Sequence, residues 1–343
     1  MTRKTVVALI SWALLVCALL MTLSATARAA SHVPLPVRNQ MPMSAALLDF
    51  VPISAEAVGR GVWDGRVSFH AANMIAQEQE DGVAMRMDLE SHTVMADLAY
   101  GITDRLTLRT ALGYRWHTGG FLDGFIEGVE ETLHLPTPWS RTHSEDGETV
   151  WWIREQSQVT FERTDPAGGL TDLTVETDWQ VSEQRGGWPA TTLRLATKVP
   201  TAPTHDALGT GGIDYGAGVA LSWGYGRWAT HLNLDVAWLA DHDGLAETAF
   251  EDTGVLRTAT LSQVVALGER WDGVLQVEAR NDPYRTEIES IIESLSAEVH
   301  LGARRTLAGG GNWFVAVTEN MMDKASPDFG VVVGIELRRG TGR

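Results

Sequence analysis

Apolar and polar residues alternate with a period of two through most of the chain, which is the pattern of half-buried β-strands. Along one segment the even-numbered Trp228, Leu232 and Leu234 are apolar, whereas the odd-numbered His231 and Asp235 are polar. Such segments run for roughly ten residues, the length of a tilted strand that crosses a bilayer. Soluble antiparallel sheets also alternate, but their strands are usually shorter and their cores more strongly hydrophobic.

The connections between these segments are alternately short and long. Short connections fall at residues 102–104, 182–187, 224–227, 268–269 and 306–311, and longer ones at 77–82, 117–170, 200–212, 240–254, 281–292 and 321–328. Bacterial outer-membrane barrels have an even number of strands, short periplasmic turns and long outer loops. The sequence therefore predicts an all-β protein, an antiparallel transmembrane β-barrel of about twelve strands with both termini on the periplasmic side.

The chain contains 13 Trp residues, and their positions support this topology. Many fall at the ends of predicted strands, where amphipathic rings favour the boundary between membrane and water. We predict that the membrane-interface aromatics are Trp179, Trp188, Trp223, Trp228, Trp238, Trp271 and Trp313. The alternative is a soluble β-sandwich, in which the Trp-bearing faces would pack against each other.

The first residues have the features of a secretory signal peptide. Arg3 and Lys4 precede an apolar run that ends near Leu23, and small residues around Ala27 fit a cleavage site. The run is also long enough to span a membrane, so a retained anchor is the alternative. The chain's single Cys, Cys17, lies in this run, and cleavage would exclude disulfides, thiol catalysis and Cys-bound metals.

This organisation predicts three parts of the chain. Residues 1–29 would be the signal peptide, residues 30–62 a periplasmic N-terminal segment, and residues 63–343 the outer-membrane β-barrel. The predicted location is the outer membrane of a Gram-negative bacterium.

Acidic residues outnumber basic ones by 44 to 27, which gives a net charge of -17. A nucleic-acid partner would need a basic face, so we predict none. The predicted partners are outer-membrane lipid and lipopolysaccharide, the export and barrel-assembly machinery, and a small-molecule solute of unknown identity.

The polar faces of the predicted strands would line the interior of the barrel. The lumen-lining candidates are Arg86, Asp88, Arg109, Arg115, Glu176, Asp178, Arg194, Lys198, His231, Asp235, Glu278, Glu298, His300, Arg304 and Glu336. Both an open polar path for solute and an interior filled by paired charges fit this set, because narrow barrels leave room only for side chains.

The longest predicted outer loop, at residues 117–170, contains an amphipathic pattern. Phe121, Leu122, Phe125 and Ile126 recur at helical spacing, with acidic residues on the opposite face. We expect one helix here, either a lid over the barrel mouth or a helix packed on its own loop.

One strand-like segment departs from regular alternation. In residues 83–101 the apolar positions change from odd, at Met85 and Leu89, to even, at Val94, with the slip near Ser91. We expect a β-bulge there, or a hairpin that reaches beyond the membrane.

Three stretches carry a family resemblance: residues 36–42 (PVRNQMP), 100–104 (YGITD) and 119–127 (GGFLDGFIE). They resemble a bacterial family catalogued as domain of unknown function 3187. The resemblance covers most of the exported chain and implies an outer-membrane location without a known activity.

Two further stretches, residues 168–173 (GGLTDL) and 198–201 (KVPT), are similar to parts of another group. That group comprises outer-membrane proteins linked to phenol meta-cleavage pathways, which are thought to pass small hydrophobic compounds. Ala202 stands where that pattern usually has Gly, so we carry over no binding residue.

These patterns together predict a passive pore or channel for small molecules, hydrophobic ones among them. The alternatives are a non-conducting structural or surface-interaction barrel and a barrel-embedded lipid-modifying hydrolase. The sequence has neither G-x-S-x-G nor H-E-x-x-H, so we predict no enzyme and no catalytic residue. Asp241, His242, Asp243 and Glu247 could hold a divalent cation. Acidic outer loops are more often solvated, and we predict no metal site and no cofactor.

Overall fold

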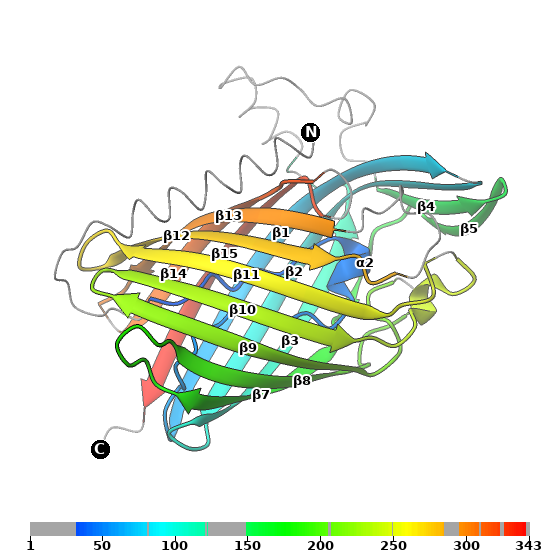
Figure 1. Cartoon of the computed structure of the whole chain (residues 1–343). Coiled ribbons are helices and arrows are strands. Elements are labelled where there is room, and N and C mark those ends of the chain that lie inside the picture. The colour runs from blue at the N-terminus through cyan, green and yellow to red at the C-terminus, as the bar shows by residue number, and fades with distance from the viewer. Residues whose placement is uncertain are drawn as a thin grey trace, which may run out of the picture.

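The computed structural model describes residues 32–80, 82–120, 122, 149–204, 207–248, 250–284, 295–308, 310–322 and 326–340. It is a closed antiparallel β-barrel, in which the end strands β1 and β2 complete the ring by pairing with β15 and β3 (Figure 1). The barrel strands are β1 (Val62–Glu80), β2 (Val83–Gly101), β3 (Leu106–Thr118), β7 (Leu173–Ser182), β8 (Ala190–Val199), β9 (Asp214–Tyr225), β10 (Trp228–Trp238), β11 (Val255–Ala266), β12 (Trp271–Asn281), β13 (Leu295–Thr306), β14 (Gly311–Asn320) and β15 (Phe329–Gly340). The predicted fold, a 12-strand antiparallel barrel, is confirmed.

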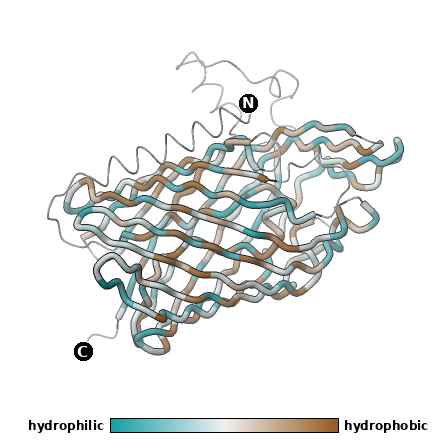
Figure 2. Tube along the Cα trace, viewed as in Figure 1, coloured by the Kyte–Doolittle hydropathy of each residue, from teal (hydrophilic) through white to brown (hydrophobic). Residues whose placement is uncertain are grey.

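Each barrel strand has a polar face toward the interior and an apolar face outward. On β10, His231 and Asp235 are buried, whereas Leu234 and Trp238 are 46% and 51% exposed on the outside. Figure 2 shows this alternation along the strands of the front wall. The period of two follows from the pleat, which points successive side chains to opposite faces.

The hairpin of β1 and β2 projects past the other strands, and each of its strands is 19 residues long (Figure 1). The two strands pair continuously, so the bulge expected near Ser91 does not occur, and the long hairpin is the alternative that forms. The apolar side chains change faces because the surroundings change. Val94 is exposed on the outside of the barrel, whereas Met85 and Met87 are buried on the opposite, inward side of the projection.

Three short strands extend the sheet beyond the ring of the barrel. They are β4 (Val150–Glu155), β5 (Gln158–Arg163) and β6 (Ala167–Leu170). β4 pairs with the projecting part of β2 and with β5, and β6 pairs with the end of β3. All three belong to the predicted long loop.

Residues 32–61, which we call the N-terminal segment, run through the interior of the barrel (blue trace in Figure 1). The segment includes the short helix α2 (Pro42–Ala45), and Leu35, Leu48 and Phe50 are buried. We expected residues 30–62 to lie apart from the barrel on its periplasmic side. The segment instead packs against interior side chains of the wall, where its apolar groups are shielded from water.

The predicted loop helix lies largely outside the described residues, including Phe121, Phe125 and Ile126. Leu122 is described and buried, and its backbone N–H donates to the carboxylate of Glu90. The helix and its role as a lid therefore stay predictions. The helices that the structure does describe, such as the 3-10 helix η2 (Asp243–Leu245), are too short or too polar to cross a membrane.

The predicted interface aromatics lie at the ends of the barrel wall. Trp179 and Trp188 are 54% and 80% exposed, and the rings of Trp271 and Trp313 meet edge to face with centroids 5.3 Å apart. Trp228 differs, because it is buried and lies under the guanidinium of Arg227. Their contact with a membrane interface stays a prediction.

Candidate functional site

The interior face of the wall carries most of the predicted lumen-lining residues. These are Arg109, Arg115, Glu176, Asp178, Arg194, Lys198, His231, Asp235, Glu278, Glu298, His300, Arg304 and Glu336. Arg86 and Asp88 are the exceptions, because they lie on the outward side of the projecting hairpin, in line with Val94. We assigned them wrongly because the apolar face of β2 changes sides along its length.

Arg194 of β8 stands at the centre of the largest cluster of charges. Its guanidinium lies 2.7 Å from Glu176 of the neighbouring β7 and 3.2 Å from Asp235 of β10, which it reaches across Gly218 of β9. Its Nη2 donates to the carbonyl of Val51 at 2.7 Å. The side chain is fully buried and its guanidinium also covers the ring of Phe50. Arg194 thus joins the wall to the N-terminal segment.

A second cluster forms around Arg280 of β12, which sequence analysis missed. Arg280 lies 3.2 Å from Glu278 and 2.5 Å from Asp49 of the N-terminal segment. Close by, the side-chain amide of Asn39 donates to Glu298 at 2.6 Å. The segment therefore supplies polar partners as well as apolar side chains.

Wall side chains also hydrogen-bond the backbone of the N-terminal segment along its length. The segment contains Pro34, Pro36, Pro42 and Pro52, so it lies irregularly and cannot satisfy its own backbone groups. Some bonds are donated by the wall: Arg304 donates to the carbonyls of Val33 and Pro34, and Arg338 donates to that of Val58. Others are donated by backbone N–H groups of the segment to wall side chains: Leu48 to Asp214, Ile53 to Asn233, Ala55 to Ser222, Ala57 to Gln180 and Val58 to Thr107.

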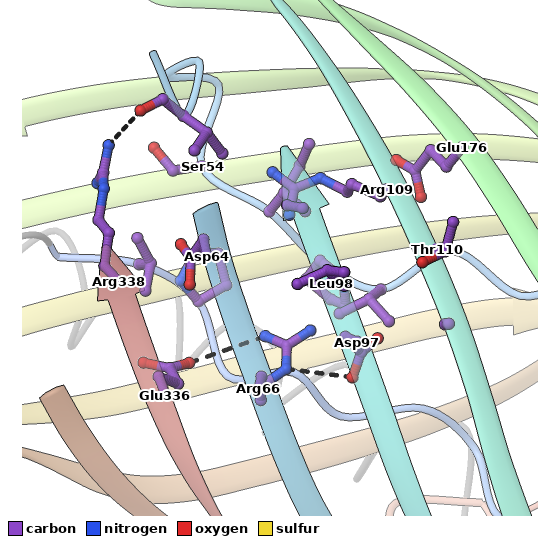
Figure 3. Close-up of a pocket in the computed structure, with 18 of the residues that line it drawn as sticks. Ser54, Asp64, Arg66, Asp97, Leu98, Arg109, Thr110, Glu176, Glu336 and Arg338 are labelled. Atoms are coloured by element: carbon purple, nitrogen blue, oxygen red, sulfur yellow. Dashed lines mark hydrogen bonds and ion pairs between the residues drawn. The ribbon is translucent and has the colours of Figure 1, made fainter. Parts of the chain in front are cut away.

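The segment leaves cavities along one side of the interior, beside β1, β2, β3 and β7. The larger, about 140 Å³, lies toward the end of the barrel where short turns join the strands, which we call the short-turn end (Figure 3). In it Arg66 bridges Glu336 and Asp97, and Asp64 and Arg338 lie on neighbouring strands. A smaller cavity of about 30 Å³ shares four lining residues with it, namely Arg38, Val51, Asp97 and Thr174.

The opposite end, which we call the long-loop end, is closed by an apolar cluster. Met43 of α2 packs there with Met85 and Met87 of the projecting hairpin, Trp151 of β4 and Phe250 of an outer loop. All five side chains are buried. Because the cluster combines α2, the hairpin and several loops, it forms a small core above the polar interior.

The sequence contained signals for the N-terminal segment that we did not use. Leu35, Val37, Leu48, Phe50 and Ile53 make the stretch unusually apolar for a segment exposed to the periplasm. Nothing in the sequence shows which strands receive it, because its partners lie far away in the chain. Ile53 and Asn233, for example, are 180 residues apart.

The acidic loop motif shows no metal geometry. Within the described part of the chain, no group of three or more His, Cys, Asp or Glu side chains is arranged to hold a metal ion. In the motif, Asp241 accepts the N–H of Thr253, and His242 is buried beside the ring of Tyr284.

The comparison with solved structures supports the fold. An outer-membrane channel from Pseudomonas putida F1, described as COG4313, superposes with a TM-score of 0.56 at 15% identity, over 85% of this chain and 100% of that one. The NanC porin matches at 8% identity over 80% of this chain and 98% of that one, with a TM-score of 0.45. The Ralstonia pickettii toluene transporter TbuX matches at 9% identity, over 82% of this chain and 90% of that one, with a TM-score of 0.40.

The family comparison agrees with the sequence resemblance. None of the curated proteins compared with the chain matches it. The model of the family described as "Protein of unknown function (DUF3187)" matches residues 9–338. The chain therefore belongs to this family, as its motifs indicated.

Proposed function

We propose that this family member is an outer-membrane channel through which small polar solutes diffuse passively. The apolar outward face and the tryptophans at the strand ends support insertion in a bilayer. The apolar run at the start of the chain supports export through a cleaved signal peptide into the envelope of a Gram-negative bacterium. The chain resembles a solved outer-membrane channel in fold, and its own interior is lined by charged side chains.

One observation carries the channel function. The N-terminal segment does not fill the barrel, and the two cavities that it leaves share lining residues on the side of β1, β2, β3 and β7. Their walls carry Arg38, Arg66, Asp97, Arg109 and Glu176. A charged lining favours hydrated polar solutes over the hydrophobic ones that the sequence also allowed, because an apolar solute gains nothing by displacing water from charges.

Single-channel conductance in planar bilayers tests the proposal. Ala111 of β3 lines the larger cavity, and Ala111→Trp would fill much of its volume, so we expect the conductance to fall severalfold. The matched control is Ala259→Trp, which adds the same side chain on the outward face of β11 and should leave conductance unchanged. If the unmodified protein inserts and does not conduct, or if both variants conduct equally, the channel proposal is wrong.

The alternative of a non-conducting barrel draws on the long-loop end, where the buried apolar cluster lies across the interior. It predicts insertion without conductance, so the same experiment separates the two functions.

The hydrolase alternative has one observation in its favour. Ser222 and His231 lie on neighbouring strands with Oγ and Nδ1 2.7 Å apart, a distance that suits a nucleophile and its base. However, Ser222 Oγ also accepts the N–H of Ala55, and the N-terminal segment covers the pair. His231 Nε2 has no hydrogen-bond partner, so no acid orients the imidazole. We therefore propose a transport function and no catalysis.

A further inference from the structure

The smaller cavity contains an arginine without a counter-ion. Arg115 of β3 is 3% exposed and lines this cavity. Its Nε donates to the hydroxyl of Thr93 at 3.2 Å, whereas its Nη1 is buried without any hydrogen-bond partner. Across the described chain, none of the ion pairs includes Arg115, although the buried Arg194, Arg280 and Arg304 each have carboxylate partners.

The carboxylates around the cavity are already engaged by other groups. Asp172 exerts the main attraction on Arg115, but its Oδ2 lies 2.7 Å from Lys198 and its Oδ1 accepts the N–H groups of Thr201 and Ala202. Both of its oxygens therefore already accept hydrogen bonds from other groups, and neither pairs with the Arg115 guanidinium.

The two other acidic residues of the cavity pair with other arginines. Asp97 is shared between Arg66 and Arg38, at 3.3 and 3.7 Å. Asp49 is held through its Oδ2 by Arg280 at 2.5 Å, and its Oδ1 is buried without a hydrogen-bond partner, so it does not reach Arg115 either.

A second arginine makes the position of Arg115 less favourable still. Arg38 of the N-terminal segment lines the same cavity and repels Arg115. A buried charge that lacks a partner is strongly destabilising, because it has lost its hydration and gained no Coulombic compensation. A small anion beside Arg115 would supply the charge partner that this guanidinium lacks.

We propose that this cavity binds a small monovalent anion, either a halide or the carboxylate group of a solute, between Arg115 and Arg38. The volume of about 30 Å³ is room for roughly two water molecules, which suits one small anion and excludes bulky ones. Thr93 on the cavity wall offers a hydroxyl that can donate to the ion.

Thermal unfolding of the full-length protein in detergent tests the site, with chloride, acetate or gluconate as the sodium salt at one fixed ionic strength. We expect the unfolding midpoint to rise, with saturation, as chloride or acetate replaces gluconate, because a ligand that binds only the folded state stabilises it. A response to chloride alone assigns a halide site, and a response to acetate assigns a carboxylate site. A midpoint that is independent of the anion overturns the proposal.

Two variants separate binding from a general effect on folding. Arg115→Met removes the unpaired charge, so in gluconate its midpoint should exceed that of the unmodified protein, and it should not respond to chloride or acetate. The matched control is Arg280→Met, an equally buried arginine with carboxylate partners. It should lower the midpoint and keep the anion response. Retention of that response in Arg115→Met, or its loss in Arg280→Met, contradicts the assignment.

The site also bears on selectivity, and this consequence rests on the proposed channel function. A bound or passing anion beside Arg115 would make the passage favour anions. In Arg115→Met, the reversal potential in a KCl gradient should therefore shift toward that of a cation-selective pore. An anion response in a protein that does not conduct would support the site and reject the channel. Conductance without an anion response would do the opposite.

Discussion

The contacts that hold the N-terminal segment differ between the two ends of the barrel. At the long-loop end, Met43 of α2 is packed in an apolar cluster with Trp151 and Phe250. Toward the short-turn end, Arg194 and Arg338 bind the carbonyls of Val51 and Val58, in addition to smaller apolar clusters such as that of Leu35 and Phe314. Apolar packing is non-directional and fills space, whereas hydrogen bonds fix only the atoms that they join. This difference explains why cavities are found beside the polar part of the segment.

The comparison also suggests which end controls passage. The polar end has cavities of about 140 and 30 Å³ lined by charges. Closing the long-loop end requires α2, the β1–β2 hairpin and the loops to stay together. We therefore expect changes in the N-terminal segment to affect conductance most. At the polar end we expect the loss of an ion pair to lower the free energy of unfolding, and at the long-loop end we expect this free energy to depend on pH.

Deletion of residues 32–58 should have the largest effect, because it removes the contents of the interior and the α2 part of the apolar cluster. We expect the barrel to form and its single-channel conductance to rise severalfold, since water can then occupy the whole interior. As the control, Ala55→Cys with Ser222→Cys would tie the segment to the wall where the Ala55 N–H now bonds Ser222 at 2.8 Å. Oxidation of that pair should keep conductance low. Equal conductance with and without the segment would show that it does not restrict the passage.

Arg194→Leu should give the next largest effect, at the polar end. The variant leaves Glu176 and Asp235 buried without their cation and removes the donor to Val51, which we expect to cost about 3–5 kcal/mol of unfolding free energy. Urea unfolding followed by Trp fluorescence would measure it. Arg339→Leu, at an exposed position, is the control and should change stability by less than about 0.5 kcal/mol. A similar loss in both variants would argue against a specific role for the cluster.

Acidification should act at the long-loop end. His242 lies in the loop after β10, and burial, with repulsion from Lys198, lowers its pKa from 6.5 to about 4. Below pH 6.5, His242 binds a proton in the unfolded chain but stays neutral in the folded chain. The free energy of unfolding should therefore fall as the pH drops from 6.5 toward 4, by at most about 3 kcal/mol. The difference in unfolding free energy between the unmodified protein and His242→Phe should follow this pH window. A difference that does not change with pH would mean that His242 is hydrated.

The barrel wall was largely predictable because each strand obeys a local rule. On β10, Trp228, Leu234 and Trp238 share the outward face and His231 and Asp235 the interior, as the alternation indicated. The rule failed at Arg86 and Asp88, where the hairpin leaves the barrel and its apolar face turns inward. Alternation shows which face of a strand is apolar, but it does not show whether that face lies on the outside of the barrel or packs against other parts of the chain.

The candidate site was less predictable than the wall. The charged side chains of the interior were identified, but their partners were not, since Arg280 pairs with Asp49 across 231 residues of sequence. Likewise Arg115 appeared as one charge among many in the sequence. Only its neighbours in space show that Asp172 is bonded to other groups and that Arg115 has no carboxylate partner among the described residues.

The sequence by itself determined the number and direction of the strands and the two faces of most of them, because the pleat ties side-chain direction to position along the chain. The tertiary structure alone decided that residues 32–61 enter the barrel and that one arginine in its interior lacks a counter-ion. Both outcomes depend on which distant residues meet inside a closed space. The alternation of residues along a strand does not show which distant residues are in contact, because the local pattern of each strand is the same whichever residue it contacts.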